Sequence, residues 1–462
     1  MNREFDLTIT HYSKKGHGTA PLMRQENQPP VKVEVVGSVI GDHLKISLGK
    51  RKKGAYRGEL LEILCSSKKR VDPRCPSAGI CGGCSWQQLS YEAQLEEKQE
   101  KVAALFKPFL NEATLHPIVP CENPWHYRNK MEFSFSENKG GEKFLGLIMT
   151  GSRGKVLTLK ECHLTESWFL KALESALTWW EESDLHAFHP PSGRGTLRTL
   201  TLREGKRTGE KMIFLTVSGD HDHFLNRTDL NTFKKAMHRA LPGENPSLFL
   251  RIHHAEKGRP TAFYEMHLEG PAALHEKLHV GSRVYDFHIS PASFFQPNTL
   301  QAEKLFEHAL KIAKPTKTMR VYDLYAGCAV LGTIFAPYVK KVVSIELCSY
   351  AACDAETNIE ANNLTNLQMM QGDVGKVLSE FQLSADLAIV DPPRSGLDGE
   401  AIKHLLRLSP QKILFISCNP VTQAENIFEL TKEGYSLLEI QPVDQFPHTP
   451  HIENICFLEK NG

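Results

Sequence analysis

Short alternating runs of hydrophobic and polar residues fill the first 66 positions and predict a small β-barrel. The runs are EFDLTITHY, VKVEVVGSVI, DHLKISLGK and YRGELLEILC, and glycines stand near the bends between them. An alternation with a period of two places one face of each strand against a core. Small barrels with a basic face commonly bind nucleic acid, but the fold alone establishes no function.

The period lengthens in YEAQLEEKQEKVAALFKPFL, which predicts a helix over residues 91–110. We expect this helix to pack on the C-terminal domain. Residues 123–280 then mix strand candidates (MEFSFS, KFLGLIM, TLRTLTLRE, KMIFLTVSG) with the helix candidate ESWFLKALESALTWWEES. The apolar residues that share one face of the first helix are Leu95, Val102, Leu105 and Phe106.

Buried strands alternate with longer helices from residue 281 onward. The strand candidates TMRVYDLYAG, KKVVSIEL, ADLAIVDPP and KILFISCNP each end in a loop with polar residues. Such alternation predicts an α/β fold with a Rossmann-like, doubly wound parallel sheet. Ligands of these sheets bind at the carboxyl ends of the strands. We expect three domains, namely a barrel (1–66), a mixed α+β domain (67–280) and a Rossmann-like domain (281–462).

Length and composition agree with this division. The chain has 462 residues, of which 41% are hydrophobic and 24% charged, as in an ordinary globular protein of about three domains. No apolar run approaches the roughly 18 residues of a membrane helix. The first residues, MNREFDLTIT, contain no apolar signal region, so we expect a cytoplasmic protein without a membrane span.

The net charge of +1 hides an asymmetry along the chain. Residues 1–74 carry 15 Lys and Arg against 8 Asp and Glu, whereas the remainder carries 40 against 46. Basic runs at 50–53 and 68–74 suit a phosphate backbone, which binds clustered cations with release of counterions. A solvated, solubilising surface is the alternative explanation for such runs.

Three of the eleven cysteines are close together. Cys75, Cys81 and Cys84 stand in RCPSAGICGGCSW with the spacing C-x5-C-x2-C. Closely spaced cysteines in a cytoplasmic chain more often hold metal or perform chemistry than form disulfides. With a fourth thiolate they suit zinc or an iron–sulfur cluster, and spacing does not decide between the two.

Two strand ends predict a nucleotide-type pocket. Gly327 closes DLYAG, and Glu346 ends the next strand, where an acidic residue can accept hydrogen bonds from ribose hydroxyls. This combination fits a dinucleotide or an S-adenosylmethionine pocket, although Cys328 and Ala329 stand where a second glycine is expected. Asp391 in VDPPRSG is held by a rigid Pro-Pro turn. Ordinary structural turns are the alternative for both loops.

A nucleophile and a base are predicted at two further strand ends. Cys418 follows a buried strand in FISCNPVT, where a thiolate can face a cleft. The segment FPHTPHIENIC then supplies His448, His451 and the candidate base Glu453, which the histidines could position, or they could bind phosphate. The alternatives are a small buried cysteine and ordinary surface histidines.

The motifs FFQPN, DLYAG, VDPPRSG, SCNP and FPHTPHIE occur in an order and spacing that resemble the RNA uracil-5 methyltransferase family. CGGCSWQ and PWHYRNKMEFSF extend the resemblance over nearly the whole chain. It is closest to the branch that acts on 23S ribosomal RNA, with an N-terminal TRAM barrel (OB-like) and an iron–sulfur cluster. The transfer-RNA branch resembles the last half but lacks the cysteine cluster.

The resemblance implies S-adenosylmethionine contacts at Gln296, Tyr325, Glu346 and Asp391, and a further one at Asp373, near the adenine. One departure is that Ala329 and Val330 replace the family's usual glycine and polar residue, which bears on the detailed cofactor contacts. In the same family pattern, Cys418 is the nucleophile and Glu453 the base, and Cys162 of KECHL joins Cys75, Cys81 and Cys84 as the fourth ligand of a 4Fe–4S cluster.

The implied activity is methylation of carbon 5 of a uridine in RNA through a covalent Cys418 adduct, with 23S ribosomal RNA as the expected partner and a monomer as the expected state. The same reaction on transfer RNA is an alternative. An adenine or cytosine amino-methyltransferase would share the Asp-Pro-Pro loop but would not need Cys418 or Glu453. A non-catalytic RNA-binding or ribosome-assembly factor is the third possibility, and Ala329 and Val330 are its sole support.

Overall fold

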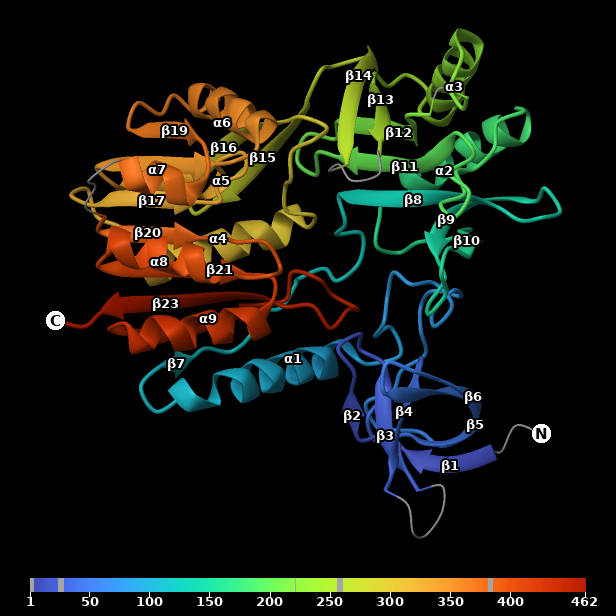
Figure 1. The fold of residues 1–462 in the computed structure, drawn as a ribbon, viewed down its shortest axis with the longest axis horizontal. Helices are drawn as coiled ribbons and strands as arrows, with labels where there is room; N and C mark the ends of the chain where they lie inside the picture. Colours follow the sequence, from blue (N-terminus) through green and yellow to red (C-terminus); the bar gives the residue numbers. More distant parts are fainter. Residues whose placement is uncertain (1–3, 24–28, 221, 256–260, 381–384) are drawn as a thin grey trace.

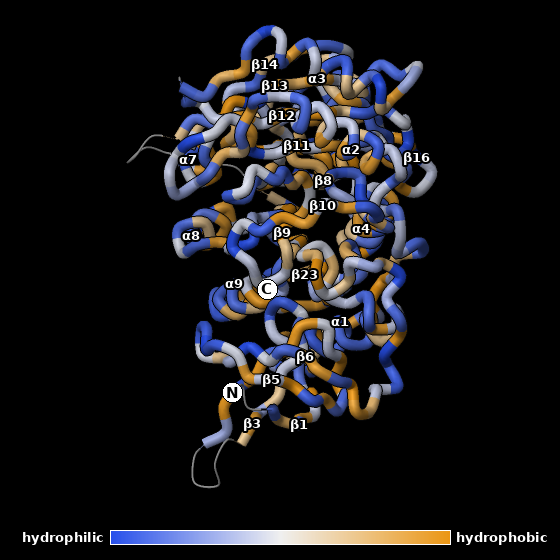
Figure 2. The backbone as a smooth tube through the Cα atoms, turned by 90° about the vertical axis from the view of Figure 1, so that its right-hand side faces the viewer, coloured by the Kyte–Doolittle hydropathy of each residue, from blue (hydrophilic) through white to orange (hydrophobic). Residues whose placement is uncertain are grey.

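The computed structural model describes residues 4–23, 29–220, 222–255, 261–380 and 385–462. Three groups of strands succeed one another along the chain, and helix α1 (Tyr91–Phe106) lies beside the C-terminal group (Figure 1). The turned view in Figure 2 places the N-terminal strands at one end of the molecule and β13 (Ser247–His254) and β14 (Ala262–Glu269) at the other. Among the described residues, no helix is long and apolar enough to cross a membrane.

The N-terminal strands form a sheet that closes on itself. Its order is β1-β5-β6-β4-β3-β2, and β2 continues the chain directly from β1, so the two edges of the sheet are linked by one segment. Alternating apolar side chains such as Val33, Val35, Leu44 and Ile46 fill the interior. The sequence pattern missed β3, whose GTAPL carries no alternation. The strands are β1 (Glu4–Thr8), β2 (His11–Tyr12), β3 (Gly18–Leu22), β4 (Val31–Val35), β5 (His43–Lys52) and β6 (Ala55–Cys65).

Helix α1 and the short strand β7 (Thr114–Leu115) belong by their packing to the C-terminal sheet. Val102 and Phe106 are fully buried in the core that α9 (Pro420–Lys432) also covers, and β7 pairs with the outer strand of that sheet. Ser90 caps the helix, since its side chain accepts a hydrogen bond from the Ala93 amide. The helix is one turn shorter than predicted and ends in a 3-10 turn over residues 107–109.

The central sheet has seven strands in the order β10-β9-β8-β11-β12-β13-β14, and its core includes apolar residues of helices α2 and α3. The sequence identified four of these strands and α2, whose Trp and Leu residues repeat at helical spacing. The elements not yet given are β8 (Lys130–Glu137), β9 (Lys143–Ile148), β10 (Val156–Thr158), β11 (Leu197–Glu204), β12 (Lys211–Ser218), α2 (Ser167–Glu181) and α3 (Arg227–Ala240).

A hairpin of β15 (Leu274–Val280) and β16 (Arg283–Ile289) joins the central and C-terminal parts. It packs on α4 (Thr299–Ala313) and α6 (Ser349–Ala361) of the C-terminal part. The boundary expected at residue 281 falls inside the hairpin turn. The hairpin shares one apolar core with residues of β12 and β13 in the central sheet and with residues of α4.

The C-terminal sheet has the order β19-β18-β17-β20-β21-β23-β22-β7. Its first five strands are parallel, and β23 runs antiparallel between β21 and β22. Because β17 lies between β18 and β20, the strand order reverses there, and the carboxyl ends of β17 and β20 form the switch point where such sheets bind ligands. The predicted α/β class is confirmed. The elements are β17 (Arg320–Leu324), α5 (Val330–Phe335), β18 (Lys341–Glu346), β19 (Leu367–Gln371), α7 (Val374–Glu380), β20 (Leu387–Val390), α8 (Gly399–Leu408), β21 (Lys412–Ser417), β22 (Tyr435–Val443) and β23 (Glu453–Lys460).

Candidate active site

The loop after β17 lies at the switch point and has an unusual backbone. Tyr325, Gly327 and Ala329 have positive φ angles of 63°, 56° and 57°. The left-handed region costs a residue with a Cβ about 1–2 kcal/mol, so surrounding contacts must hold this loop. Ala329 adopts the left-handed conformation that glycine would adopt freely. The alanine in place of the family's glycine therefore adds strain, but the backbone of the loop can still follow the same course.

Glu346, the last residue of β18, holds this loop in place. Its Oε2 accepts a hydrogen bond from the Gly327 amide at 2.9 Å, and its Oε1 accepts one from the Cys348 amide at 2.8 Å. A carboxylate has about four acceptor positions, so Glu346 retains capacity for the ribose hydroxyls of a nucleotide-type ligand.

Two carboxyl groups with raised pKa values lie at the switch point. Asp323 in β17 accepts hydrogen bonds from the Gly332 amide (2.9 Å) and the Ser344 hydroxyl (3.0 Å), and burial raises its pKa to about 7. Burial together with the neighbouring Asp323 raises the pKa of Asp391 to about 7 as well. A cationic ligand would stabilise the ionised form of such a pair. Asp323 was not singled out from the sequence, although a carboxyl inside a predicted buried strand is a signal that the sequence contains.

Gln296 reaches the site from the segment that precedes α4. Its carbonyl accepts a hydrogen bond from the Asn129 side chain at 2.9 Å, and its Oε1 accepts one from Gln445 Nε2 at 3.4 Å. The Cys328 thiol donates to the Phe294 carbonyl at 3.6 Å, which links FFQPN to the loop after β17.

Tyr325 and Asp373 lie close to each other at the same end of the sheet. Burial raises the pKa of Tyr325 to about 12, and the carboxyl groups of Asp398 and Asp373 add to this effect. Asp373 also accepts a hydrogen bond from the Lys376 amide in the first turn of α7 at 3.1 Å.

Cys418 and Glu453 lie at the same edge of two neighbouring strands. Cys418 directly follows β21, and Glu453 is the first residue of β23. The antiparallel register of β21 and β23 pairs Ser417 with Asn454, so the next pair outward is Cys418 and Glu453. Cys418 immediately precedes Asn419, the N-cap of the 13-residue helix α9, whose positive end favours a thiolate. Strands far apart in sequence thus bring the predicted nucleophile and base together.

Arg394 of VDPPRSG joins this pair and was not singled out from the sequence. Burial raises the pKa of the Cys418 thiol, and the carboxyls of Glu453 and Asp391 raise it further, whereas a hydrogen bond and the positive charge from Arg394 lower it. Burial also raises the pKa of Glu453 well above its usual range, and Asp391 adds to the effect. The site therefore contains two buried carboxyls, Asp391 and Glu453, beside the Cys418 thiol. The Arg394 guanidinium supplies the positive charge that opposes their negative charges.

Arg394→Met should raise the pKa of Cys418 further, because it removes the hydrogen bond and the charge that stabilise the thiolate. Alkylation of Cys418 by iodoacetamide should rise with pH into the alkaline range in the original chain, and the variant should need a higher pH. Mass spectrometry of the peptide that contains Cys418 measures this, with Arg239→Met at the exposed end of α3 as the control. An unchanged pH profile in Arg394→Met would show that the guanidinium does not act on the thiol.

A cleft of about 810 Å³ opens above Cys418. One wall comes from the N-terminal barrel (residues 10–14), a second from α1 with Glu97 and Lys101, and the floor from the C-terminal sheet with Arg394. The cleft is wide enough for a nucleotide, and parts of the chain about 400 residues apart line it together.

The two histidines of FPHTPHIE have different environments. His451 is exposed and lines the cleft. His448 is buried, stacks on Trp125 with ring centroids 3.9 Å apart, and has a pKa lowered to about 4 by burial. Burial lowers the pKa of His451 to about 4 as well. The two histidines therefore differ in position, since His451 lines the cleft whereas His448 packs inside against Trp125.

The four cysteines predicted as ligands line one cavity. They come from the loop before α1 and from the segment before α2, and Glu161 and Gln87 lie beside them. Burial raises the pKa of Cys84 to about 12, and the nearby thiols add to this, so thiolates here would require a cationic centre. No group of three or more His, Cys, Asp or Glu side chains in the described ranges has the arrangement of a single-ion site. The lining cysteines are Cys75, Cys81, Cys84 and Cys162.

Comparison with known proteins agrees with this geometry. Residues 266–461 match the family model described as tRNA (uracil-5-)-methyltransferase. An uncharacterized RNA methyltransferase from Protochlamydia amoebophila is 47% identical over 92% of this chain and 99% of its own length. Another from Chlamydia trachomatis is 37% identical over 84% of this chain and 98% of its own length.

A solved structure extends the similarity to the whole fold. The tRNA (uracil-54, C5)-methyltransferase of Pyrococcus abyssi, in complex with S-adenosyl-L-homocysteine, covers 98% of this chain and 100% of its own, with a TM-score of 0.73 and 25% identity. These relatives match a chain whose site has a thiol, a carboxyl pair and a nucleotide-type pocket at one end of the sheet. The chain therefore belongs to the RNA uracil-5 methyltransferase family, and it catalyses S-adenosylmethionine-dependent methylation of carbon 5 of uridine in RNA.

Proposed function

We propose that the chain methylates a uridine of 23S ribosomal RNA, with Cys418 as the nucleophile and Glu453 as the base. The observation that carries the assignment of these two residues is their adjacency at one edge of β21 and β23, where Cys418 lines the cleft and Glu453 is buried directly behind it. Carbon 5 of uracil is a poor nucleophile, so a reaction at this carbon needs a group that activates the ring.

The Cys418 thiolate adds to carbon 6 of the uracil and turns the ring into an enolate that is nucleophilic at carbon 5. S-adenosylmethionine supplies the methyl group that carbon 5 accepts. Glu453 then removes the proton from carbon 5, the bond between sulfur and carbon 6 breaks, and Cys418 leaves as a thiolate. Arg394 stabilises that thiolate at both the start and the end of the cycle.

Gln296, Tyr325, Glu346 and Asp391 are the proposed contacts of S-adenosylmethionine, with Asp373 as a further position. Their support is their place at the switch point and the raised pKa of Asp391, whose ionised form suits a sulfonium cation. The reaction also requires the target base to leave its stack, which costs a few kcal/mol. The barrel and α1, which form walls of the cleft, are placed to offset that cost through RNA contacts.

The four cysteines are proposed to hold a 4Fe–4S cluster with a structural role, since methyl transfer moves no electrons. Four thiols around one cavity are the donor set of such a cluster. The two residues that follow Cys84 bind the segment that leads to Glu453. The amides of Ser85 and Trp86 both donate to the His448 carbonyl at 3.0 Å. Loss of the metal is therefore expected to loosen the segment that leads to Glu453.

Anaerobically purified protein should be brown, with iron and sulfide in cluster stoichiometry, and Cys162→Ser should lose iron and melt at a lower temperature. Metal analysis and thermal unfolding measure this, with Cys353→Ser on the exposed side of α6 as the matched control. Stoichiometric zinc in a colourless sample would contradict the cluster.

Two features bear on which RNA is methylated, the cysteine set and the whole-chain match. The cysteine set supports ribosomal RNA through the resemblance to the 23S branch. The full-length match to the Pyrococcus abyssi enzyme supports transfer RNA as the second candidate, because a protein described as a tRNA methyltransferase shares the complete architecture. The barrel therefore does not separate the two classes of substrate.

The discriminating experiment uses unmodified total RNA, labelled S-adenosylmethionine and the purified protein. Label in 23S ribosomal RNA, mapped to one or a few uridines, would support the proposal. Label confined to transfer RNA would replace it with the second candidate, and an Asp391→Asn variant provides the control for background transfer.

A further inference from the structure

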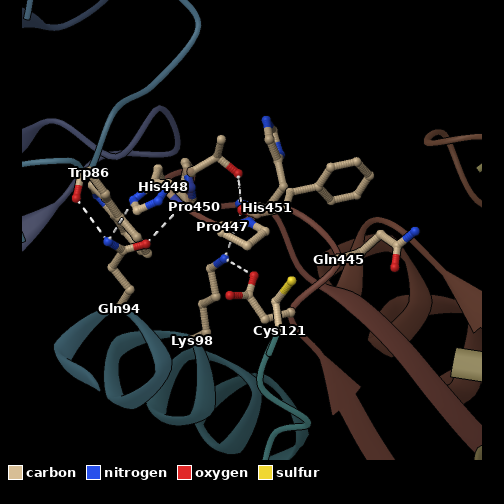
Figure 3. Close-up of polar contacts among 12 residues, drawn as sticks. Trp86, Gln94, Lys98, Cys121, Gln445, Pro447, His448, Pro450 and His451 are labelled. Atoms are coloured by element: carbon tan, nitrogen blue, oxygen red, sulfur yellow. Dashed lines mark hydrogen bonds and ion pairs between the residues drawn. The ribbon is translucent and has the colours of Figure 1, made fainter. Parts of the chain in front are cut away.

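The loop between β22 and β23 (residues 444–452, the β22–β23 loop) is held by donors from outside it. Figure 3 shows side chains of α1 directed at this loop. Five of its carbonyl oxygens accept such hydrogen bonds, as a loop whose residues are almost all buried requires. The donors, at 3.0–3.3 Å, are Asn298 to Gln445, Lys98 to Phe446, Tyr127 to Pro447, the Ser85 and Trp86 amides to His448, and Lys101 to Pro450.

A buried ion pair anchors the start of the loop. Lys98 Nζ and Asp444 Oδ1 are 2.5 Å apart, and both side chains are completely buried. The Tyr91 hydroxyl donates to Asp444 Oδ2 at 2.8 Å, so a second residue of α1 holds the same carboxylate. Lys98 is also 5.9 Å from the Trp86 ring centroid.

Gln94, one turn before Lys98, holds the middle of the loop. Its Oε1 accepts a hydrogen bond from the His448 amide at 2.8 Å, and its Nε2 donates to the Trp86 carbonyl (Figure 3). The same Nε2 also donates to the Leu89 carbonyl. His448 has a φ of 64°, a conformation that needs such external contacts to persist.

The anchored end of the loop is next to the proposed base. β22 and β23 pair Val443 with Glu453, and Asp444 is the residue that follows Val443. A displacement of Asp444 would therefore move the strand end that carries Glu453 relative to Cys418. Proton abstraction tolerates little displacement, because donor and acceptor must approach within hydrogen-bond distance.

We infer that Lys98, with its partner Asp444, is a positioning residue for the second half of the reaction: the pair fixes Glu453 where it can take the proton from carbon 5. This inference rests on the proposed role of Glu453. A buried ion pair gives little net stability, since the loss of hydration offsets the attraction, and an apolar pair would fill the same volume at least as well. Such a pair is better explained by the geometry it imposes than by stability.

The test is Lys98→Met combined with Asp444→Asn, which removes both charges and leaves Tyr91 an acceptor. With natural uridine RNA, turnover should fall about 10–100-fold and the covalent protein–RNA adduct should accumulate on denaturing gels. The rate of trapping by 5-fluorouridine RNA, which reports the steps up to methylation, should stay within about three-fold of the original. Equal slowing of both rates, or no accumulation, would overturn the inference.

Two further variants keep the result interpretable. Tyr127→Phe removes one donor to the loop without a change of shape. Even if the double variant folds poorly, this variant should lower turnover and let the adduct accumulate while the trapping rate changes little. Arg207→Met with Glu303→Gln removes an ion pair of 2.6 Å between the segment that joins β11 to β12 and helix α4, and should leave turnover and adduct accumulation unchanged. The same adduct accumulation in that control would also overturn the inference.

Glu453→Gln, measured in parallel, separates this inference from the proposed function. If Glu453→Gln accumulates the adduct and the double variant does not, the positioning role of Lys98 is wrong and the base assignment stands. If Glu453→Gln accumulates none, the base assignment itself is wrong.

Discussion

Cys418→Ala is expected to lower methylation of RNA by at least about 10⁴-fold, because without the thiolate carbon 5 of uracil is not activated. Binding of S-adenosylmethionine should remain, since Cys418 follows β21, while the proposed cofactor contacts Tyr325, Glu346 and Asp391 lie at the ends of β17, β18 and β20. Transfer of labelled methyl to RNA and calorimetric titration of the cofactor measure the two properties.

Cys353→Ala is the matched control for this prediction, since Cys353 is an exposed cysteine on α6. It should keep full activity. Near-normal activity in Cys418→Ala would contradict covalent catalysis and favour an amino-methyltransferase, which needs no thiol.

Glu453→Gln should stop the reaction after methyl transfer. Glutamine has the shape of glutamate but cannot take the proton from carbon 5, so elimination of Cys418 should slow by about 10²–10⁴-fold. Because burial already raises the pKa of Glu453, a neutral side chain there should change the melting temperature little.

A protein–RNA adduct that forms with natural uridine and survives denaturation is the expected signature of Glu453→Gln. Glu433→Gln, an exposed carboxyl at the end of α9, is the control and should form no lasting adduct. An inactive Glu453→Gln protein without any adduct would place Glu453 before the methyl transfer and not after it.

The sequence predicted four parallel strands of the C-terminal sheet, β17, β18, β20 and β21, because these strands are buried on both faces and appear as apolar runs. Each run ends in a polar residue, and the fold brings those ends together, as for Cys418 and Glu453. The four cysteines also line one cavity, although 78 residues separate Cys84 from Cys162.

The sequence did not reveal the polar half of α1. Its buried face includes Gln94 and Lys98 beside Val102 and Phe106, and an apolar period shows only the last two. The partner of Lys98 is Asp444, 346 positions away, so no local pattern signals the pair. Arg394 was missed for a related reason, since its effect on Cys418 comes from the packing of two separate loops.

The covalent bond between Cys418 and the uracil ring is tested most directly by reaction of the protein with S-adenosylmethionine and RNA that contains 5-fluorouridine. Mass spectrometry of the denatured complex then locates any adduct. We expect a methylated adduct on the peptide that contains Cys418, absent in Cys418→Ala, because fluorine cannot leave as a proton does. Normal cofactor binding without an adduct on RNA that the protein methylates, or an adduct on another residue, would contradict this mechanism.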